Sequence, residues 1–333
     1  MPSSSQCDST PPEADDGTVR LPPPGPGPVV TAWTAQPLMI ALAALLVVGY
    51  AAGLRRLQRS GRRWPAGRTA TFAFGTLALV WTGCGFLAAY SSAVYWAWTA
   101  RVLVLWLVVP ILVLAGRPVE LARAAGAGAG LDRFLQSRPA RVIANPLVGP
   151  ALVPALSAVL FFGPVAGWSI GVPPFGWVLD VLLLVVGALM VLPLVGLDGE
   201  ASSLAVGLAL GIGSFELVLD ALPGIVLRLH TTVATGWYAH RDLQAWSPQP
   251  LRDQQVAGAI LWCVAELIDL PFLVLVFRRW LQADARDAAR VDAVLEAERA
   301  ARRALETTAP AVERDAPWWE SDPAMQERLR RHG

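Results

Sequence analysis

Seven long apolar stretches are the dominant feature of this 333-residue chain. A helix needs about 20 apolar residues to cross the hydrocarbon core of a bilayer. Only 16% of the residues are charged, whereas ordinary soluble domains carry about 25%. The sequence therefore predicts an all-α, polytopic membrane protein, a bundle of seven transmembrane helices. The predicted spans are Leu38–Leu54, Thr69–Tyr90, Val94–Ala115, Pro146–Trp168, Phe175–Leu197, Ser202–Leu222 and Val256–Phe277.

Polar segments flank this apolar region. Residues 1–36 are rich in serine, proline and acidic residues, a composition typical of disordered or polyproline segments. Residues 281–333 are highly charged, and from Gln282 to Leu305 they combine many alanines with acidic and arginine residues at helical spacing. We expect a disordered tail at 1–36, a transmembrane domain at 37–280 and a charged tail at 281–333. That last tail is predicted to be helical at first and disordered after Pro310, either as a solvated helix or as one that docks on a partner.

The placement of arginine predicts the orientation of the bundle. The chain has no lysine, so all 27 basic residues are arginines. Six lie in the loop 55–68, five lie in the loop 116–145 and two directly follow the last predicted span. Because basic residues concentrate on the cytoplasmic side, we expect the N-terminus outside, the C-terminus in the cytoplasm and the protein in a bacterial plasma membrane. Four arginines fall on the predicted outer side: Arg20, Arg228, Arg241 and Arg252.

Composition and motifs argue against several classes of function. A formal net charge of +1 disfavours a nucleic-acid partner. Cys7, Cys84 and Cys263 are too few and too scattered for a disulfide framework or a zinc site. The chain contains no nucleophile–base pair, zinc-protease motif or phosphate-binding loop, so we expect no enzymatic activity.

Charged residues inside the predicted spans are the first candidates for a functional site, because a charge in the membrane is costly and normally faces the bundle interior. At about 1.5 Å rise per residue, Arg101, Asp180 and Glu216 lie about 8–10 Å below the outer ends of their spans. Asp220 is one turn above Glu216 on the same face. We therefore predict an ion cluster in which the guanidinium of Arg101 bridges two carboxylates.

Glu266 and Asp269 lie deeper, on the last span, without an obvious basic partner. They could be protonated, could bond the backbone or Trp262, or could line a water-filled cavity. For the whole set two interpretations stay open. The charges either neutralise one another to hold the helices together, or they form a functional polar cavity.

One segment resembles a known family. Asp253-Gln254-Gln255, followed by Gly258 and Trp262, resembles the run that opens the last transmembrane helix of the CtaG-like cytochrome c oxidase assembly factors. The basic segment 62–68 and the proline-bearing segment 110–119 are similar to two further parts of that family, and the resemblance covers roughly residues 38–280. It implies an oxidase subunit with a copper centre as the partner.

In this segment Asp253 is a good candidate for the N-cap of the last span. Gln254 and Gln255 could donate hydrogen bonds to the neighbouring loop. A contact with a partner is the alternative role for all three.

The chain departs from this family at the histidines that are its presumed copper ligands. The resemblance places Trp98 and Val102 of span three, and Gly176 and Asp180 of span five, where the family's histidines would stand. Copper is therefore implied by the resemblance while its ligands are absent, and only His230 and His240 remain as weak metal-ligand candidates. We predict that an ion pair of Arg101 and Asp180 has replaced the metal pocket.

Two functions follow from these observations. The first is a membrane assembly factor for cytochrome c oxidase copper-centre biogenesis that does not ligate copper through histidine. The alternative is a small transporter or proton-coupled membrane protein that uses the intramembrane carboxylates. Against the alternative, the chain has no inverted repeat and no matching pair of interrupted helices.

Overall fold

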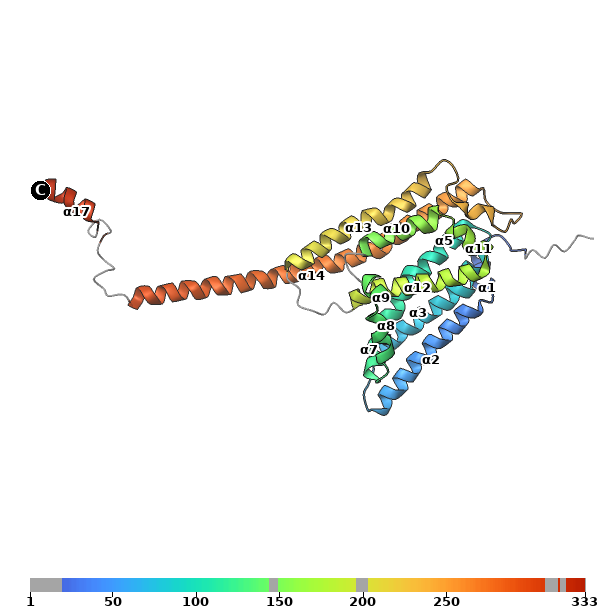
Figure 1. The fold of residues 1–333 in the computed structure, drawn as a ribbon, viewed down its shortest axis with the longest axis horizontal. Helices are drawn as coiled ribbons and strands as arrows, with labels where there is room; N and C mark the ends of the chain where they lie inside the picture. Colours follow the sequence, from blue (N-terminus) through green and yellow to red (C-terminus); the bar gives the residue numbers. More distant parts are fainter. Residues whose placement is uncertain (1–19, 144–148, 196–202, 309–316, 318–321, 333) are drawn as a thin grey trace, which may run out of the picture. The chain divides into compact units, whose positions relative to one another are not determined.

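The computed structural model describes residues 20–143, 149–195, 203–308, 317 and 322–332 of the chain. These residues form helices, and no strand occurs among them, which confirms the all-α prediction (Figure 1). They fall into two units: the first comprises residues 1–199 and 211–273, the second residues 200–210 and 274–333.

The helices of the first unit follow the predicted spans closely, with short helices at the connections (Figure 1). In chain order they are α1 (Pro26–Thr31), α2 (Pro37–Arg59), α3 (Ala66–Cys84), α4 (Phe86–Tyr90), α5 (Tyr95–Leu103), the π-helix η1 (Val104–Val108), α6 (Val109–Ala115), α7 (Pro118–Ala124), α8 (Ala129–Leu135), α9 (Arg138–Ile143), α10 (Gly149–Phe162), α11 (Val165–Gly171) and α12 (Pro173–Val195). Then come α13 (Ser203–Leu229), the 3-10 turn η2 (Gly236–Ala239) and α14 (Pro250–Thr308). The part of α13 before residue 211 and the part of α14 after residue 273 belong to the second unit.

Four helices or helix runs in the described residues are long and apolar enough to cross a membrane: Pro37–Arg59, Ala66–Tyr90, Tyr95–Ala124 and Pro173–Val191. A fifth is the pair Leu152–Phe162 and Val165–Gly171, if this pair, bent by 58°, is one span. The chain is therefore a multi-span helical membrane protein. The last two predicted spans fall on α13 and on the first half of α14, and their crossing of the membrane stays a prediction, as does the orientation. Residues 146–148, 196–197 and 202 of the predicted spans lie outside the described residues.

Two glycines allow the central helices of the first unit to cross closely. A Cβ on Gly75 of α3 would lie 2.7 Å from the amide nitrogen of Val113 on α6. A Cβ on Gly187 of α12 would lie 1.8 Å from the carbonyl oxygen of Trp106 in η1. Pro110 has no N–H, so it cannot donate the helical hydrogen bond to the Trp106 carbonyl, and the ladder there widens into a π-turn. Small residues at such crossings let backbones pack directly in a membrane bundle.

The N-terminal tail is more ordered than its composition predicts. Residues 20–36 include α1, and the backbone of Leu21 bonds both the Gln244 side chain (N–Oε1 3.1 Å) and the Trp246 indole (O–Nε1 2.6 Å). The Tyr90 hydroxyl donates to the carbonyl of Pro22 over 2.7 Å. The prediction of disorder up to residue 36 is therefore wrong for residues 20–36, because distant polar side chains bond this backbone. Residues 1–19 lie outside the described part of the chain.

The C-terminal side also differs from the prediction. Helix α14 runs without a break through residue 280, where we placed a domain boundary, and it ends at Thr308. A further helix, α17 (Pro323–His332), lies in the segment predicted to be disordered. Its start is stabilised locally, because the Asp322 carboxylate accepts a hydrogen bond from the amide of Ala324 over 2.9 Å and Pro323 suits a first helical position. Residues 309–316 lie outside the described residues.

Candidate functional site

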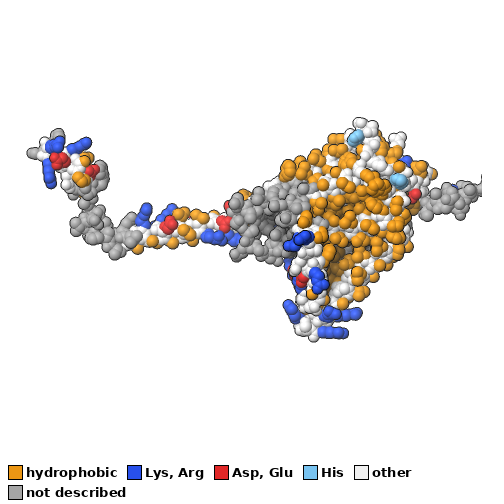
Figure 2. Space-filling view, in the orientation of Figure 1, with side chains coloured by type: hydrophobic (Ala, Val, Ile, Leu, Met, Phe, Trp, Pro, Cys, Tyr) orange, Lys and Arg blue, Asp and Glu red, His pale blue; other side chains and the backbone are white. Residues whose placement is uncertain are grey.

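Two opposite ends of the first unit differ in composition. We call the end formed by residues 230–249, between α13 and α14, the loop end, and the end formed by the turn 60–65 with α7 and α8 the arginine end. Figure 2 shows basic side chains gathered at the arginine end, histidines at the loop end and an almost wholly hydrophobic face between them. Such a face suits contact with lipid.

The Asp253 carboxylate binds the start of another helix. Its Oδ2 accepts a hydrogen bond from the amide of Tyr95 (2.8 Å), and its Oδ1 accepts one from the amide of Trp96 (3.1 Å), at the N-terminus of α5. The prediction that Asp253 caps its own helix is therefore wrong: α14 begins three residues earlier, at Pro250, so Asp253 lies in its first turn. A carboxylate here satisfies two helix-start amides and complements the helix dipole of α5.

Burial shifts the ionisation of this carboxylate. Desolvation raises the pKa of Asp253 above its ordinary value of 3.8, although the two amides and the nearby Tyr238 hydroxyl and Arg241 oppose the shift. Burial, and then the charge of Asp253, raise the pKa of Tyr238. The Asp253 carboxylate is thus enclosed beneath the loop end.

The two glutamines bond the loop, as predicted. Oε1 of Gln254 accepts from the amide of Ala234 (2.7 Å), and its Nε2 donates to the carbonyl of Thr232 (3.2 Å). Nε2 of Gln255 donates to the carbonyl of His230 over 3.4 Å. Gln254 is fully buried, so its side chain replaces the backbone partners that this irregular loop lacks.

Beneath the loop lies an aromatic core. Tyr95, Trp98 and Trp237 are almost fully buried, with the ring centroid of Tyr95 5.6 Å from Trp98 and 5.5 Å from Trp237. The indole of Trp98 donates to the hydroxyl of Ser169 on α11 over 2.9 Å. Tyr95 and Trp98 lie near the outer end of a predicted span, a position typical of interfacial aromatics. Packing instead places both of them inside.

Arg101 and Asp180 form a buried ion pair one turn further along these helices. Nη2 of Arg101 on α5 lies 2.5 Å from Oδ2 of Asp180 on α12, and their side chains are 10% and 5% exposed. The structure therefore joins two of the four residues in the predicted cluster. The helices that carry them also cross at Gly187, so the pair and the crossing together set the register of α12 against the α5–α6 helix.

The other predicted acids are placed differently. Asp220 on α13 is also buried, and Arg101 forms its ion pair with Asp180. The depth of a residue along its helix does not fix the direction in which its side chain points around the helix axis. Equal depth alone therefore does not imply that the Arg101 guanidinium bridges two carboxylates. Glu266 accepts a hydrogen bond from the indole of Trp262 over 3.3 Å, one of the alternatives considered above. The side chains of Glu216 and Asp269 lie outside the described residues.

The four positions at which the resemblance would place copper ligands carry side chains that do not suit copper. Trp98, Val102 and Gly176 offer no donor for copper, and Asp180 is engaged with Arg101. Both loop histidines are exposed: His240 packs over the glycines of α11, and Nδ1 of His230 accepts from the amide of Thr232 (3.3 Å). Within the described residues, no three His, Cys, Asp or Glu side chains gather where they could hold a metal.

These features define a multi-span helical membrane protein with a buried ion pair under a hydrogen-bonded loop. Comparison with known proteins makes this more specific. The family described as cytochrome c oxidase caa3 assembly factor (Caa3_CtaG) matches residues 48–283. The chain belongs to this family, which confirms the resemblance inferred from the sequence.

The curated relatives are mycobacterial. The uncharacterized protein Mb0105 of Mycobacterium bovis is 29% identical over 284 residues, which cover 81% of this chain and 42% of that protein. The uncharacterized protein ML1998 of Mycobacterium leprae is 26% identical over 275 residues, which cover 79% of this chain and 41% of that protein. The chain thus spans about two fifths of the length of these relatives. No solved structure matches the chain.

Proposed function

We propose that this protein is a non-enzymatic assembly factor that acts on a subunit of cytochrome c oxidase in the plasma membrane. The observation that carries the proposal is the family match over residues 48–283. That match includes both the Arg101–Asp180 pair and the Asp253-Gln254-Gln255 segment, so the structural features described above belong to the matched domain.

The proposal includes seven spans, with the N-terminus outside and the C-terminus in the cytoplasm. Helices α13 and α14 supply the two spans beyond the five candidates found by length and composition. The orientation is supported by the arginines of the turn 60–65 and of α7 and α8, because such residues favour the cytoplasmic side.

The proposed role is to hold an oxidase subunit. It does not include binding copper at the positions where the family's histidines would stand. Support comes from the donor set: the residues at these positions are two hydrophobic side chains, a glycine and an ion-paired carboxylate. The transporter alternative has no support in the comparisons. Among the intramembrane acids, Asp180 pairs with Arg101 and Glu266 accepts a hydrogen bond from Trp262.

Deletion of the gene in the source organism tests the proposal. We expect the amount of assembled cytochrome c oxidase to fall and to recover when the wild-type gene is restored. Added copper should not restore it, because the protein supplies a scaffold and not the metal. Oxidase content is measured from membrane haem spectra, with succinate dehydrogenase as the matched control. Unchanged oxidase content in the deletion strain would reject the assembly role, and recovery with copper alone would reject the scaffold role.

A further inference from the structure

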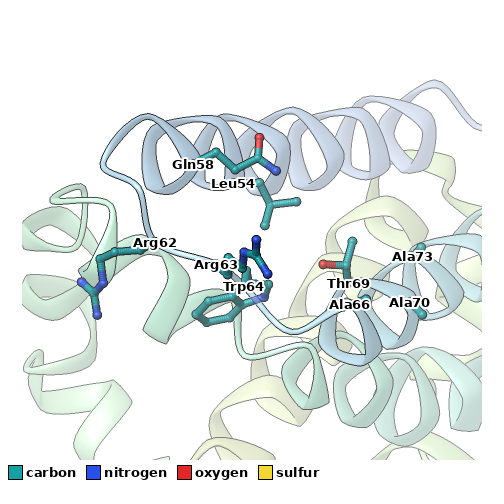
Figure 3. A pocket seen from close by; sticks show the side chains of 9 residues that line it. All are labelled: Leu54, Gln58, Arg62, Arg63, Trp64, Ala66, Thr69, Ala70 and Ala73. Carbon is teal, nitrogen blue, oxygen red and sulfur yellow. The ribbon is translucent and has the colours of Figure 1, made fainter.

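A groove opens at the arginine end, where α2 ends and α3 begins. It has a volume of about 590 Å³. Leu54 and Gln58 of α2 form one wall, and the turn between the helices closes the end of the groove (Figure 3). The lining residues are Leu54, Gln58, Arg62, Arg63, Trp64, Ala66, Thr69, Ala70 and Ala73.

The floor of this groove is a strip of small apolar side chains. Ala66, Ala70 and Ala73 share one face of α3, because they are four and three residues apart. From Ala66 to Ala73 the helix rises about 10 Å, which is about two thirds of the depth of one hydrocarbon leaflet. The strip is long enough to hold the first part of an acyl chain.

The turn holds Arg63 beside this strip, with Arg62 next to it in the sequence (Figure 3). Gly61 has φ +73°, and the amides of Gly61 and Arg62 donate to the carbonyls of Gln58 (3.0 Å) and Leu57 (3.2 Å). This is the Schellman pattern that ends a helix with a defined turn. Arg63 then lies between α2 and Trp64, while Arg62 extends to the other side of the turn (Figure 3).

These two arginines are not neutralised within the described residues. Both are exposed and form no ion pair there. The nearby Glu120 is already bonded by Arg68 (3.0 Å) and by Arg117. The Trp64 indole is also engaged, because its Nε1 donates to the Tyr50 hydroxyl over 2.9 Å and the Arg68 guanidinium lies 5.0 Å from its ring centroid. The groove therefore combines uncompensated positive charge with an apolar floor.

We propose that this groove binds one anionic phospholipid. The phosphate group lies against the Arg63 guanidinium, Arg62 adds attraction, and one acyl chain lies along Ala66, Ala70 and Ala73. The groove joins positive charge to an adjoining apolar strip, in a helix pair that crosses the membrane. This combination favours a lipid, because a free phosphate would bind the arginines and leave the strip without a partner. The proposal does not depend on the assembly role.

The test compares lipid retention by variants of the full chain. Protein purified in mild detergent is incubated with vesicles of phosphatidylglycerol or phosphatidylcholine, and bound lipid is counted by native mass spectrometry. We expect selective retention of phosphatidylglycerol at one per protein. Each basic residue near an anionic surface contributes about fivefold in affinity, so Arg62→Ala with Arg63→Ala should weaken retention about 25-fold. Ala70→Leu, which fills the strip without changing charge, should also weaken retention of the lipid.

Matched controls separate the groove from the general charge of this end. Arg56→Ala with Arg133→Ala removes two exposed arginines outside the groove, and Ala44→Leu adds the same side chain on an exposed face of α2; neither should change retention. The proposal is overturned if the double variant of Arg62 and Arg63 retains the lipid, or if the control pair loses it equally. It is also overturned if glycerol phosphate alone competes fully and Ala70→Leu has no effect, because the groove would then bind a free phosphate group.

Discussion

At the loop end, the polar side chains of α14 bond inward to backbone amides and carbonyls, whereas at the arginine end most charged side chains face outward. Asp253 and Gln254 are buried and contact α5 and the loop. Arg62 and Arg63 are exposed and have no acidic partner in the described residues. Asp253 and Gln254 therefore stabilise the fold, whereas Arg62 and Arg63 remain exposed at the surface.

This difference follows from what each end must satisfy. The loop end contains irregular backbone, whose amides and carbonyls need partners wherever water is excluded. The arginine end consists of tight turns and short helices whose backbone is already bonded, so its side chains remain available. Substitutions at the two ends should consequently differ in cost.

The largest effect is expected beneath the loop end. Arg101→Ala leaves the buried carboxylate of Asp180 without its cation and should lower the free energy of unfolding by about 3–5 kcal/mol. Arg68→Ala at the arginine end breaks a partly exposed pair with Glu120 and should cost about 1 kcal/mol. Unfolding by denaturant in detergent micelles measures both. Equal losses of unfolding free energy in the two variants would contradict the contrast between the ends. The double variant R101A/D180A should lose less unfolding free energy than R101A alone, because no unpaired carboxylate stays buried.

Asp253→Ala should have the next largest effect. It leaves the amides of Tyr95 and Trp96 without acceptors, at an expected cost of about 2–3 kcal/mol. Hydrogen exchange of these two amides should accelerate together, which can be followed by mass spectrometry of peptides covering α5. Unchanged exchange at α5 would show that water replaces the carboxylate and that the cap is not structural.

The adjacent glutamines offer an internal comparison within the loop end. Gln254→Ala removes two hydrogen bonds from a buried side chain and should cost about 1–2 kcal/mol. Gln255→Ala removes one long bond at 3.4 Å and should change stability by less than about 0.5 kcal/mol. Protease susceptibility of the loop 230–249 should rise only for Gln254→Ala. The reverse order would contradict the assignment of the buried side chain as the one that orders the loop.

The smallest effect is a dependence on pH. The pKa of Asp253 is raised in the folded protein, so between 3.8 and that raised pKa the folded state binds more protons than the unfolded state. The contribution of Asp253 to stability is therefore fully present below pH 3.8 and falls as pH rises through its folded pKa. The difference in unfolding free energy between wild type and Asp253→Asn should fall over this window. A difference that rises with pH would mean that the hydrogen bonds from the two amides, rather than burial, dominate the pKa of the Asp253 carboxylate.

Several features could be predicted because they depend on position along the chain. The apolar stretches predicted the helices, and the constant rise per residue placed Arg101 and Asp180 at one depth, where they meet. The bonds from Gln254 to the loop followed from its place beside that loop. Pro110 could have signalled the π-turn, since a proline inside an apolar helix frees the carbonyl four residues earlier.

Other features carry no local signal. Asp253 caps a helix whose first residue lies 158 positions earlier in the chain. The backbone of Leu21 is bonded by Gln244 and Trp246, which lie 223 and 225 residues further along the chain. Tyr95 and Trp98 look like interfacial aromatics in the sequence and are buried only because α11 and the loop pack over them.

The amino-acid sequence was enough to predict that most of this protein is helical and suited to lipid, and to locate its long apolar helices. These properties depend on composition and on the regular rise of a helix. The pairing of Arg101 with Asp180 and the contact of Asp253 with α5 follow instead from how the helices pack. The direction of a side chain around its helix becomes meaningful only once the neighbouring helices are in place.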